Sequence, residues 1–178
     1  FIHADDAYGT PGPDGKPDAI REPLTDDVLR RHVYGKARIG AYTVDREGFA
    51  SSICIDIDTH DPVLARNVAD QFEQLGFYPI IESSKSKGFH VWALSEPVIA
   101  DNLRRIGLYI VEKVGAPQLE VFPKQAQRPQ GGLGNFVWLP LFGADLPKGR
   151  TVFLNRKNGL APFPDQLDVL NSIRRASL

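Results

Sequence analysis

Apolar residues follow two spacings along the chain, and these predict both strands and helices. Alternating or continuous apolar runs predict strands at 39–44, 49–58, 78–84 and 88–95, shorter strands at 119–122 and 136–141, and an edge strand at 151–155. Polar turns at 45–48 and 84–87 are expected to join the first four strands into two hairpins.

Apolar residues recur at helical spacing over 62–75, which predicts a helix. Asp61-Pro62 opens this helix, with proline at its first position, and Gly76 ends it. Further helices are expected after the N-cap residue Thr25, over roughly 99–114, and from near Pro164. Each of these helices has an apolar side that is expected to face the core.

The resulting order of elements is β-β-α-β-β-α-β-β-(β)-α. Helices follow hairpins rather than single strands, which predicts an α+β fold with a mainly antiparallel sheet. The segment 9–23 is rich in Gly, Pro and Asp and is expected to be a loop or flexible arm. We therefore expect a single domain over 1–178, with an N-terminal arm or loop at 1–23 and the core at 24–178.

Composition is that of a globular domain and adds several exclusions. The chain has 178 residues, 42% of them hydrophobic and 24% charged, and no apolar run is long enough to span a bilayer. Cys54 is the single cysteine, which excludes an internal disulfide and a cysteine-based zinc knuckle, and a cytoplasmic location fits best. Because the chain begins at Phe1 and lacks methionine, it is expected to be a fragment of a longer protein.

The net charge of −1 is not typical of a nucleic-acid-binding protein, but the charge is unevenly distributed. Residues 1–61 hold 12 Asp and Glu against 7 Lys and Arg, whereas residues 62–178 hold 10 against 14. An acidic, metal-binding part beside a basic, phosphate-binding part would give this pattern, and so would chance asymmetry on a solvated surface.

An acidic pair closes the predicted strand ICIDID (53–58). Alternate residues share one face of a strand, so the three isoleucines should point into the core while Asp56 and Asp58 point together to the other side. Two carboxylates so placed raise each other's pKa unless a cation lies between them. Mg²⁺ and Mn²⁺ prefer such oxygen ligands, although an ordinary solvated strand end would explain the same residues.

Hydroxyl groups, lysines and a glycine are concentrated in the turn SSKSKG (83–88). Its backbone N–H groups, hydroxyls and lysine charges could hold a phosphate. His90 follows on the next strand, on the same face as Trp92, and could donate to a triphosphate oxygen or assist proton transfer. The alternative is a polar hairpin turn beside a structural histidine.

A third acidic residue, Glu120, alternates with apolar neighbours on a short strand. It could complete a three-carboxylate site with Asp56 and Asp58, and Lys124 and Arg128 lie just beyond it, where they could meet phosphates. The alternative is an ordinary surface glutamate.

The glycine-rich turn at 131–135 either allows a ligand to approach the backbone closely or serves only a tight turn. Phe136 and Trp138, on the following strand, are expected in the core rather than as platforms for base stacking. Asn135, which ends the turn, and Arg128 are the residues expected to contact DNA.

Three segments in this order, ICIDID (53–58), SKSKGFHVW (84–92) and EVFPK (120–124), resemble the signature of the archaeo-eukaryotic primase superfamily. That signature is an acidic pair on one strand, a Ser-x-His-type motif and a third acidic residue. GNFVWLPLF (134–142) and DQLDVLNSIRR (165–175) resemble primase-polymerases of mobile elements and of bacterial conflict and CRISPR-associated systems. RRHVYGKARIGAYTV (30–44) is similar to the lead-in to the first acidic strand, so the resemblance covers about 24–175.

The resemblance implies a catalytic core with an RRM-like sheet, helices packed on one of its faces, and a smaller α/β unit. The residues that it implies as ligands of two Mg²⁺ or Mn²⁺ ions are Asp56, Asp58 and Glu120. The residues expected to bind the nucleoside triphosphate are Lys85, Ser86, Lys87, His90 and Lys124. No zinc is expected, because the cysteines of the zinc motif found in some relatives are missing.

The activity implied is template-dependent nucleotidyl transfer by a two-metal mechanism, as in a DNA primase or DNA-directed polymerase. The expected partners are a single-stranded DNA template, a primer strand, and ribo- or deoxyribonucleoside triphosphates. A helicase or nuclease module in the parent chain is a further candidate partner.

Two other functions stay open at this point. A metal-dependent nuclease could use Asp56, Asp58, Glu82 and Lys85, although Glu82 and Lys85 are one residue further apart than in the usual Glu-x-Lys motif. A non-catalytic RRM-like module that binds nucleic acid would usually present exposed aromatic residues in a basic setting.

Overall fold

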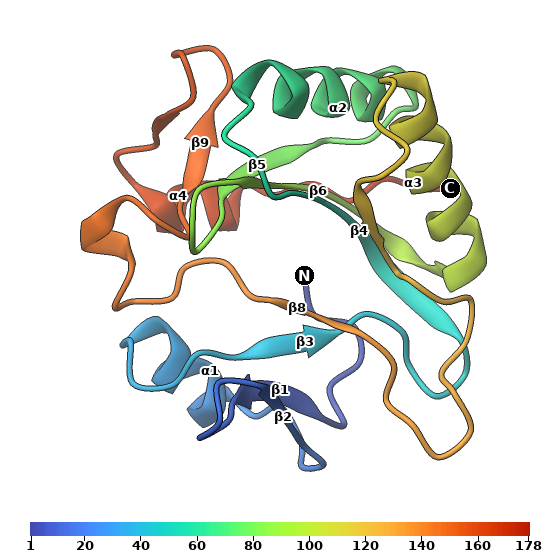
Figure 1. Cartoon of the computed structure of the whole chain (residues 1–178), viewed down its shortest axis with the longest axis vertical. Coiled ribbons are helices and arrows are strands. Elements are labelled where there is room, and N and C mark those ends of the chain that lie inside the picture. The colour runs from blue at the N-terminus through green and yellow to red at the C-terminus, as the bar shows by residue number, and fades with distance from the viewer.

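The computed structural model describes all residues, 1–178, which form two antiparallel sheets and four α-helices (Figure 1). The strands of the larger sheet are β4 (Phe49–Ile57), β5 (Ile80–Ser83), β6 (Phe89–Ile99), β7 (Glu120–Phe122), β9 (Phe153–Asn155) and β10 (Ala161–Pro162). They lie side by side in the order β10-β9-β5-β6-β4-β7, and every neighbouring pair is antiparallel. The predicted α+β fold with a mainly antiparallel sheet is therefore confirmed.

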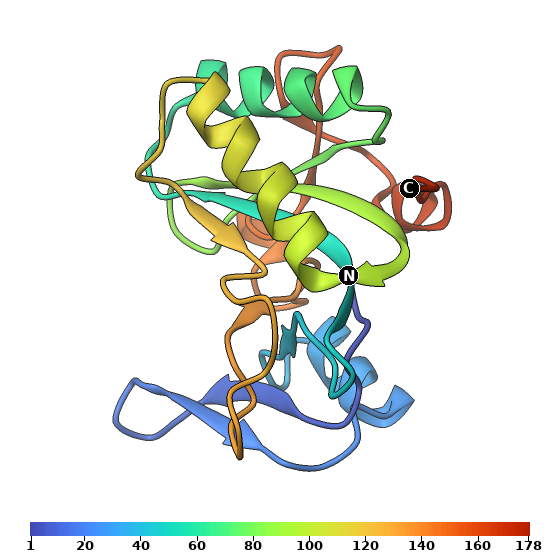
Figure 2. The ribbon, with the colours of Figure 1, turned by 90° about the vertical axis from the view of Figure 1, so that its right-hand side faces the viewer.

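Two helices, α2 (Pro62–Gln74) and α3 (Ala100–Lys113), cover one face of the larger sheet (Figures 1 and 2). α2 begins where the sequence predicts, because the Asp61 carboxylate accepts a hydrogen bond from the backbone N–H of Leu64 at 2.9 Å. Pro62, at the first helical position, has no N–H group that needs a partner. The helices and the sheet enclose the main core, a cluster of 23 buried residues.

The smaller sheet lies on the opposite side of the larger sheet from α2 and α3 (Figure 2). Its strands are β1 (Tyr8–Pro11), β2 (Pro17–Ile20), β3 (Gly40–Tyr42) and β8 (Phe136–Trp138), in the spatial order β2-β1-β3-β8. The helix α1 (Asp26–Val33) begins after the predicted N-cap Thr25. A second, smaller core consists of Tyr8, Leu24, Ile39, Ala41 and Leu139.

The first predicted hairpin is wrong. The sequence predicts that 39–44 pairs with 49–58, but β3 pairs with β1 and β8 in the smaller sheet, whereas β4 pairs with β6 and β7 in the larger one. The turn between β3 and β4 therefore connects the two sheets. Alternation of apolar residues identifies a strand, but contacts far away in the sequence decide which strand becomes its partner.

Three smaller expectations also need correction. The segment 1–23, expected as an arm or loop, holds β1 and β2, which form a hairpin around the Gly- and Pro-rich residues 12–16. β9 is not an edge strand, because β10 pairs with its outer side. A 3₁₀ turn, η1 (Leu146–Lys148), precedes β9, and the last helix, α4 (Gln166–Asn171), follows β10. Leu167 on α4 is 60% exposed and does not face the core as expected.

None of the helices combines the length and the apolar character that a membrane crossing requires.

Candidate active site

Four polar side chains lie in one row across the larger sheet. The strand register pairs Glu120 on β7 with Asp56 on β4, Asp56 with His90 on β6, and His90 with Glu82 on β5. Register partners in antiparallel strands lie directly opposite each other, so these side chains share one face of the sheet. Ile55, one position earlier on β4, belongs to the main core beneath the helices. The polar row therefore occupies the face that is turned toward the smaller sheet.

The place of Glu120 depends on a close approach between α3 and β7. A Cβ atom at Gly107 on α3 would overlap the Cγ1 atom of Val121 and would lie 3.2 Å from the Cγ2 atom of Ile53. Only glycine allows the helix to lie this near the strand. Gly107 thus helps to keep Glu120 beside Asp56.

Asp56 is the centre of the acidic group. Its side chain is 23% exposed, and its Oδ1 atom lies 3.7 Å from Nε2 of His90. Burial raises the pKa of Asp56, His90 partly offsets this, and the negative charges of Asp58, Glu120 and Glu82 raise the pKa further. The pKa of Asp56 therefore lies above its ordinary value, with burial as the main cause and the neighbouring carboxylates as a further one.

The three predicted metal ligands are neighbours, but they do not form a preorganised metal site. Asp56 and Glu120 both line a cavity of about 360 Å³. Asp56 also lines a second cavity, of about 240 Å³, together with Asp58. Oε1 of Glu120 lies 2.8 Å from Nζ of Lys124, and no group of three His, Cys, Asp or Glu side chains converges as metal ligands. Three carboxylates suit Mg²⁺ or Mn²⁺ chemically. Binding through all three would require Glu120 to exchange Lys124 for an ion.

His90 lies between two acidic side chains. Its Nδ1 atom is 3.0 Å from Oε2 of Glu82, and its Nε2 atom faces Asp56. Burial of the ring lowers the pKa of His90, but the charge and hydrogen bond of Glu82 and the charges of Asp56 and Asp58 outweigh it. The pKa of His90 is therefore raised, and its protonated form is favoured at this position.

The serine- and lysine-rich turn has a defined shape. Oγ of Ser84 accepts hydrogen bonds from the backbone N–H groups of Gly88 at 3.0 Å and Ser86 at 3.3 Å. A Cβ atom at Gly88 would overlap the carbonyl oxygen of Ile57, which immediately precedes Asp58. The turn therefore packs directly against the end of the acidic strand.

The predicted phosphate ligands of this turn face two cavities. Lys85, Ser86 and Lys87 are all exposed. Lys85 and Ser86 line the 240 Å³ cavity that contains Asp56 and Asp58. Ser86 and Lys87 line a separate cavity of about 410 Å³, whose other cationic residues are Lys148 and Arg150.

The 360 Å³ cavity has an aromatic wall. Phe136 and Trp138, expected in the core, are both partly exposed there, and their ring centroids lie 4.8 Å apart at an angle of 75°. That expectation is wrong because alternate residues of β8 point to opposite faces: Val137 is the one buried in a core cluster with Cys54 and Trp92, whereas Phe136 and Trp138 line the cavity. Asn135 and Lys124 line the same cavity, which brings two more predicted residues near Asp56.

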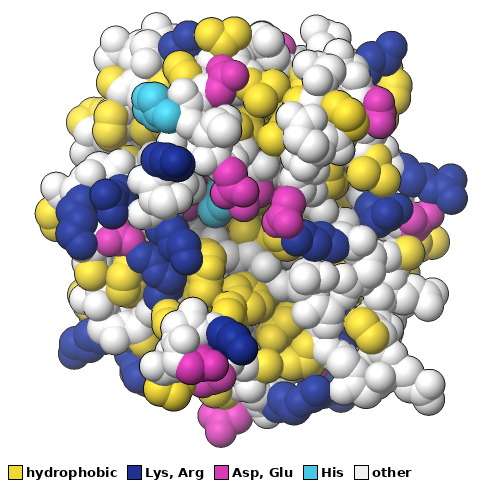
Figure 3. Space-filling model, in the orientation of Figure 1, with side chains coloured by type: hydrophobic (Ala, Val, Ile, Leu, Met, Phe, Trp, Pro, Cys, Tyr) yellow, Lys and Arg dark blue, Asp and Glu magenta, His cyan; other side chains and the backbone are white.

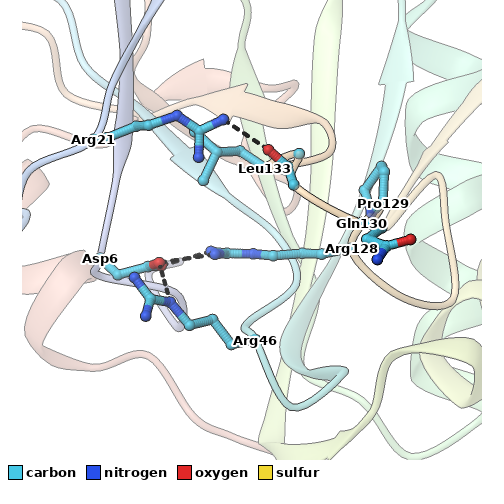
Figure 4. A pocket seen from close by; sticks show the side chains of 9 residues that line it. Asp6, Arg21, Arg46, Arg128, Pro129, Gln130 and Leu133 are labelled. Atoms are coloured by element: carbon cyan, nitrogen blue, oxygen red, sulfur yellow. Dashed lines mark hydrogen bonds and ion pairs between the residues drawn. The ribbon is translucent and has the colours of Figure 1, made fainter.

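Arg128 lies apart from this row, in a pocket of about 430 Å³ (Figure 4). Its Nη1 and Nη2 atoms donate to the Asp6 carboxylate at 2.8 and 2.6 Å, and its Nε atom donates to the carbonyl of Val44 at 2.6 Å. The hydrogen bond from Arg128 is the main reason why the pKa of Asp6 lies well below its usual range. Arg21 and Arg46 line the same pocket, and the Arg46 side chain is 73% exposed, so it is more accessible to solvent than Arg128, whose side chain is 8% exposed.

Arg38 is a site residue that the sequence does not reveal. It lines the 240 Å³ cavity together with Asp58 and Lys85, and its guanidinium group pairs with Asp145 and lies 4.4 Å from the Phe142 ring centroid. Arg38 falls within 30–44, but no local motif distinguishes it there from the other basic residues.

A two-sheet α+β domain with an acidic pair, a third acidic residue in register and a Ser- and Lys-rich turn has the features of a primase-polymerase catalytic domain. A family model described as the archaeo-eukaryotic primase domain of the TOTE conflict system matches residues 16–178. The chain therefore belongs to this family and is a domain of the primase/polymerase type.

Among solved structures, the chain is similar to the polymerase domain of Mycobacterium tuberculosis ligase D, which was determined in complex with DNA. The two share 15% sequence identity with a TM-score of 0.48, over 99% of this chain and 79% of that chain. No curated protein matches the chain.

Proposed function

We propose that this domain transfers nucleotides from nucleoside triphosphates to the 3′-hydroxyl group of a primer strand paired with a DNA template, with release of pyrophosphate, and that the reaction depends on a divalent metal. The observation that carries the proposal is the register pairing of Glu120 with Asp56, next to Asp58 and the basic turn at 84–88. Membership of the archaeo-eukaryotic primase family supports the same reaction class.

In this proposal Asp56, Asp58 and Glu120 hold two Mg²⁺ or Mn²⁺ ions. When bound, such ions lower the pKa of the attacking hydroxyl and stabilise the charge that develops on the leaving pyrophosphate. Lys124 is paired with Glu120 in the structure and would be free to contact a phosphate if Glu120 held an ion instead.

The remaining predicted residues hold the substrates. The exposed Lys85, Ser86 and Lys87 contact the triphosphate, and His90 donates to it through Nε2, the nitrogen that faces Asp56. Figure 3 shows acidic side chains near the middle of this face, with Lys and Arg side chains on both sides of them. The basic groups on either side attract a polyanionic substrate, and ions held by the acidic centre would supply the positive charge that offsets the repulsion between its phosphates and the carboxylates.

The DNA contacts are assigned to exposed groups around the cavities. Asn135, exposed at the 360 Å³ cavity, and Arg128 are the predicted contacts, and the structure adds Arg46 as the more exposed guanidinium in the pocket that Arg128 lines. Contacts to the phosphate backbone are largely electrostatic, so DNA binding is expected to weaken as the salt concentration rises.

The test is extension of a labelled primer on a single-stranded DNA template with Mg²⁺ or Mn²⁺ and each type of nucleotide supplied separately. Wild-type protein should lengthen the primer, and Asp56→Ala and Asp58→Ala should abolish lengthening while the circular dichroism spectrum is unchanged. Asp70→Ala is the matched control, because Asp70 lies on α2, across the sheet from the site. Full activity in either site variant would refute the assignment.

The same assay separates polymerase from nuclease activity, because a nuclease shortens the labelled strand without added nucleotides. All four residues of the alternative nuclease set line the 240 Å³ cavity. Glu82, however, is only 1% exposed, and its Oε2 atom accepts a hydrogen bond from Trp92 and contacts His90. These contacts make Glu82 a buried structural partner of Trp92 and His90 rather than a metal ligand, which favours polymerase activity over nuclease activity.

A further inference from the structure

Glu82 is an acidic residue buried directly behind His90. Its Oε2 atom accepts a hydrogen bond from the indole Nε1 of Trp92 at 2.7 Å and lies 3.0 Å from Nδ1 of His90. An indole N–H group can only donate, so Oε2 acts as an acceptor. The contact of this acceptor with His90 therefore places a hydrogen on Nδ1, in the neutral ring and equally in the protonated ring, in which Nε2 carries a hydrogen as well.

This bond determines which nitrogen of His90 the active site receives. With Nδ1 held by Glu82, Nε2 is directed toward Asp56, 3.7 Å from Oδ1. The Trp92 ring packs beside His90, perpendicular to the His90 ring at a centroid distance of 5.9 Å, but it makes no hydrogen bond to the histidine. A flip of the imidazole ring would break the bond to Glu82 and leave a buried acceptor with one partner fewer.

We propose that Glu82 is a positioning residue, which fixes the ring of His90 so that Nε2 is presented beside Asp56 to the incoming nucleotide. The inference rests on the proposed function, in which His90 contacts the triphosphate. Glu82 itself is too deeply buried to touch a substrate and acts through His90.

A merely structural role for Glu82, as the partner of the Trp92 N–H group, makes different predictions. In that case its replacement would lower stability and activity whether or not His90 is present. If Glu82 acts through His90, its effect on catalysis disappears when His90 is removed, because the effects of substitutions within one hydrogen-bonded network are not additive.

The kinetic test is a double-mutant cycle with Glu82→Leu and His90→Ala, read as kcat and KM for the nucleotide in primer extension. Glu82→Leu is expected to lower kcat/KM by about tenfold to a hundredfold, the range known for removing the hydrogen-bond partner that orients a metal-ligating histidine. Glu82→Gln, which keeps an oxygen acceptor of the same size, should restore most of that loss. In the His90→Ala background, Glu82→Leu should have no further effect, and an additive loss would overturn the proposal.

Trp92→Phe is the matched control. It removes the other donor to Glu82 but leaves the bond to His90, so it should lower the unfolding temperature and leave kcat/KM close to the wild-type value. A loss of kcat/KM as large as that of Glu82→Leu would show that Glu82 only supports the core.

A nitrogen-15 NMR measurement of the histidine rings tests the inference without any activity. His90 should show a protonated Nδ1 in the wild type, assigned by comparison with His90→Ala, and this state should be lost in Glu82→Leu. If Glu82→Leu does not fold, the wild-type spectrum still decides, because an unprotonated Nδ1 contradicts the proposal. If the wild type does not extend primers, the proposed function is refuted, but the NMR signal of His90 still tests whether Glu82 holds Nδ1.

Discussion

Asp56 and Glu120 are register partners on adjacent antiparallel strands, although two helices and two strands separate them in the sequence. Their Cβ atoms are expected about 4.5–5.5 Å apart, and like charges directly opposite each other destabilise a sheet. Asp58 adds a third negative charge nearby, and the raised pKa of Asp56 reflects the combined effect of burial and these charges. The domain therefore carries a repulsion that a bound cation would relieve.

Removal of one charge from this pair is expected to stabilise the domain when divalent metals are absent. A raised pKa means that the folded state disfavours the ionised form of Asp56, so Asp56→Asn should raise the free energy of unfolding at neutral pH. The gain should be about 0.2–1 kcal/mol, the size of a cross-strand charge interaction. Thermal unfolding in the presence of a chelator measures it, and a lower unfolding temperature would contradict the expectation.

In the presence of a divalent metal, the carboxylate of Asp56 should stabilise the domain instead of destabilising it. A ligand that binds only the folded state raises its stability, so Mn²⁺ should raise the unfolding temperature of the wild type in a concentration-dependent manner. Asp56→Asn should show little of this shift, whereas Asp70→Asn on α2 should respond like the wild type. An equal shift in all three proteins would mean that the ion binds elsewhere.

The contact between Gly107 and Val121 should couple the core to the active site. Gly107→Ala inserts a methyl group that overlaps Cγ1 of Val121, and such overpacking typically destabilises by about 1–3 kcal/mol. Because β7 must move away from α3, primer extension should fall as Glu120 is displaced from Asp56. Both effects are measured on the same preparation, by unfolding in urea and by extension rate.

A compensating substitution provides the control for this prediction. Val121→Ala removes the methyl group that the new Cβ meets, so the double variant Gly107→Ala/Val121→Ala should recover part of both losses. Simple addition of the two single losses would show that displacement of β7 is not the cause.

The turn at 84–88 should depend on the absence of a side chain at Gly88. A Cβ atom there meets the backbone oxygen of Ile57, which cannot rotate away, so Gly88→Ala should shift the turn and lower stability by about 2 kcal/mol or more. The KM for the nucleotide should rise, because Lys85 and Ser86 move with the turn. Gly132→Ala is the milder comparison, since its Cβ would meet only the side chain and carbonyl oxygen of Pro129, the nearest atom at 3.1 Å.

His32 should make stability depend on pH. The ring is buried, accepts a hydrogen bond from the backbone N–H of Ile39 at 3.0 Å and donates to the carbonyl of Pro140 at 3.0 Å, which requires the neutral form. Burial lowers the pKa of His32, and the hydrogen bond to Pro140 offsets this only in part. Below the ordinary pKa of about 6.5 the unfolded chain binds a proton that folded His32 does not, so stability should fall as the pH decreases.

The measurement compares the free energy of unfolding at pH 7 and pH 5.5 in the wild type and in His32→Gln. The variant should be less stable at pH 7 but should lose less stability on acidification. His90, whose pKa is raised, contributes the opposite slope in both proteins, and the comparison cancels it. A steeper loss in His32→Gln than in the wild type would contradict the assignment.

Local patterns in the sequence identified much of the fold and the acidic part of the site. Periodicity located the strand that contains Asp56 and is followed by Asp58, the helix that begins at Pro62, and the short strand of Glu120. These features are local, because the pleat of a strand and the turn of a helix repeat over a few residues. Helix capping by Asp61 and the turn chemistry at 84–88 are local for the same reason.

Tertiary structure alone decided which of these elements meet. It separated β3 from β4, moved Phe136 and Trp138 from the core to a cavity wall, and brought Arg38 into the site. It also placed Glu82, a residue whose sequence neighbours give no hint of its role, directly behind His90. Strand register and the packing of two sheets depend on contacts between residues far apart in the chain. The local periodicity of a strand is the same whichever strand it pairs with, so it cannot identify the partner.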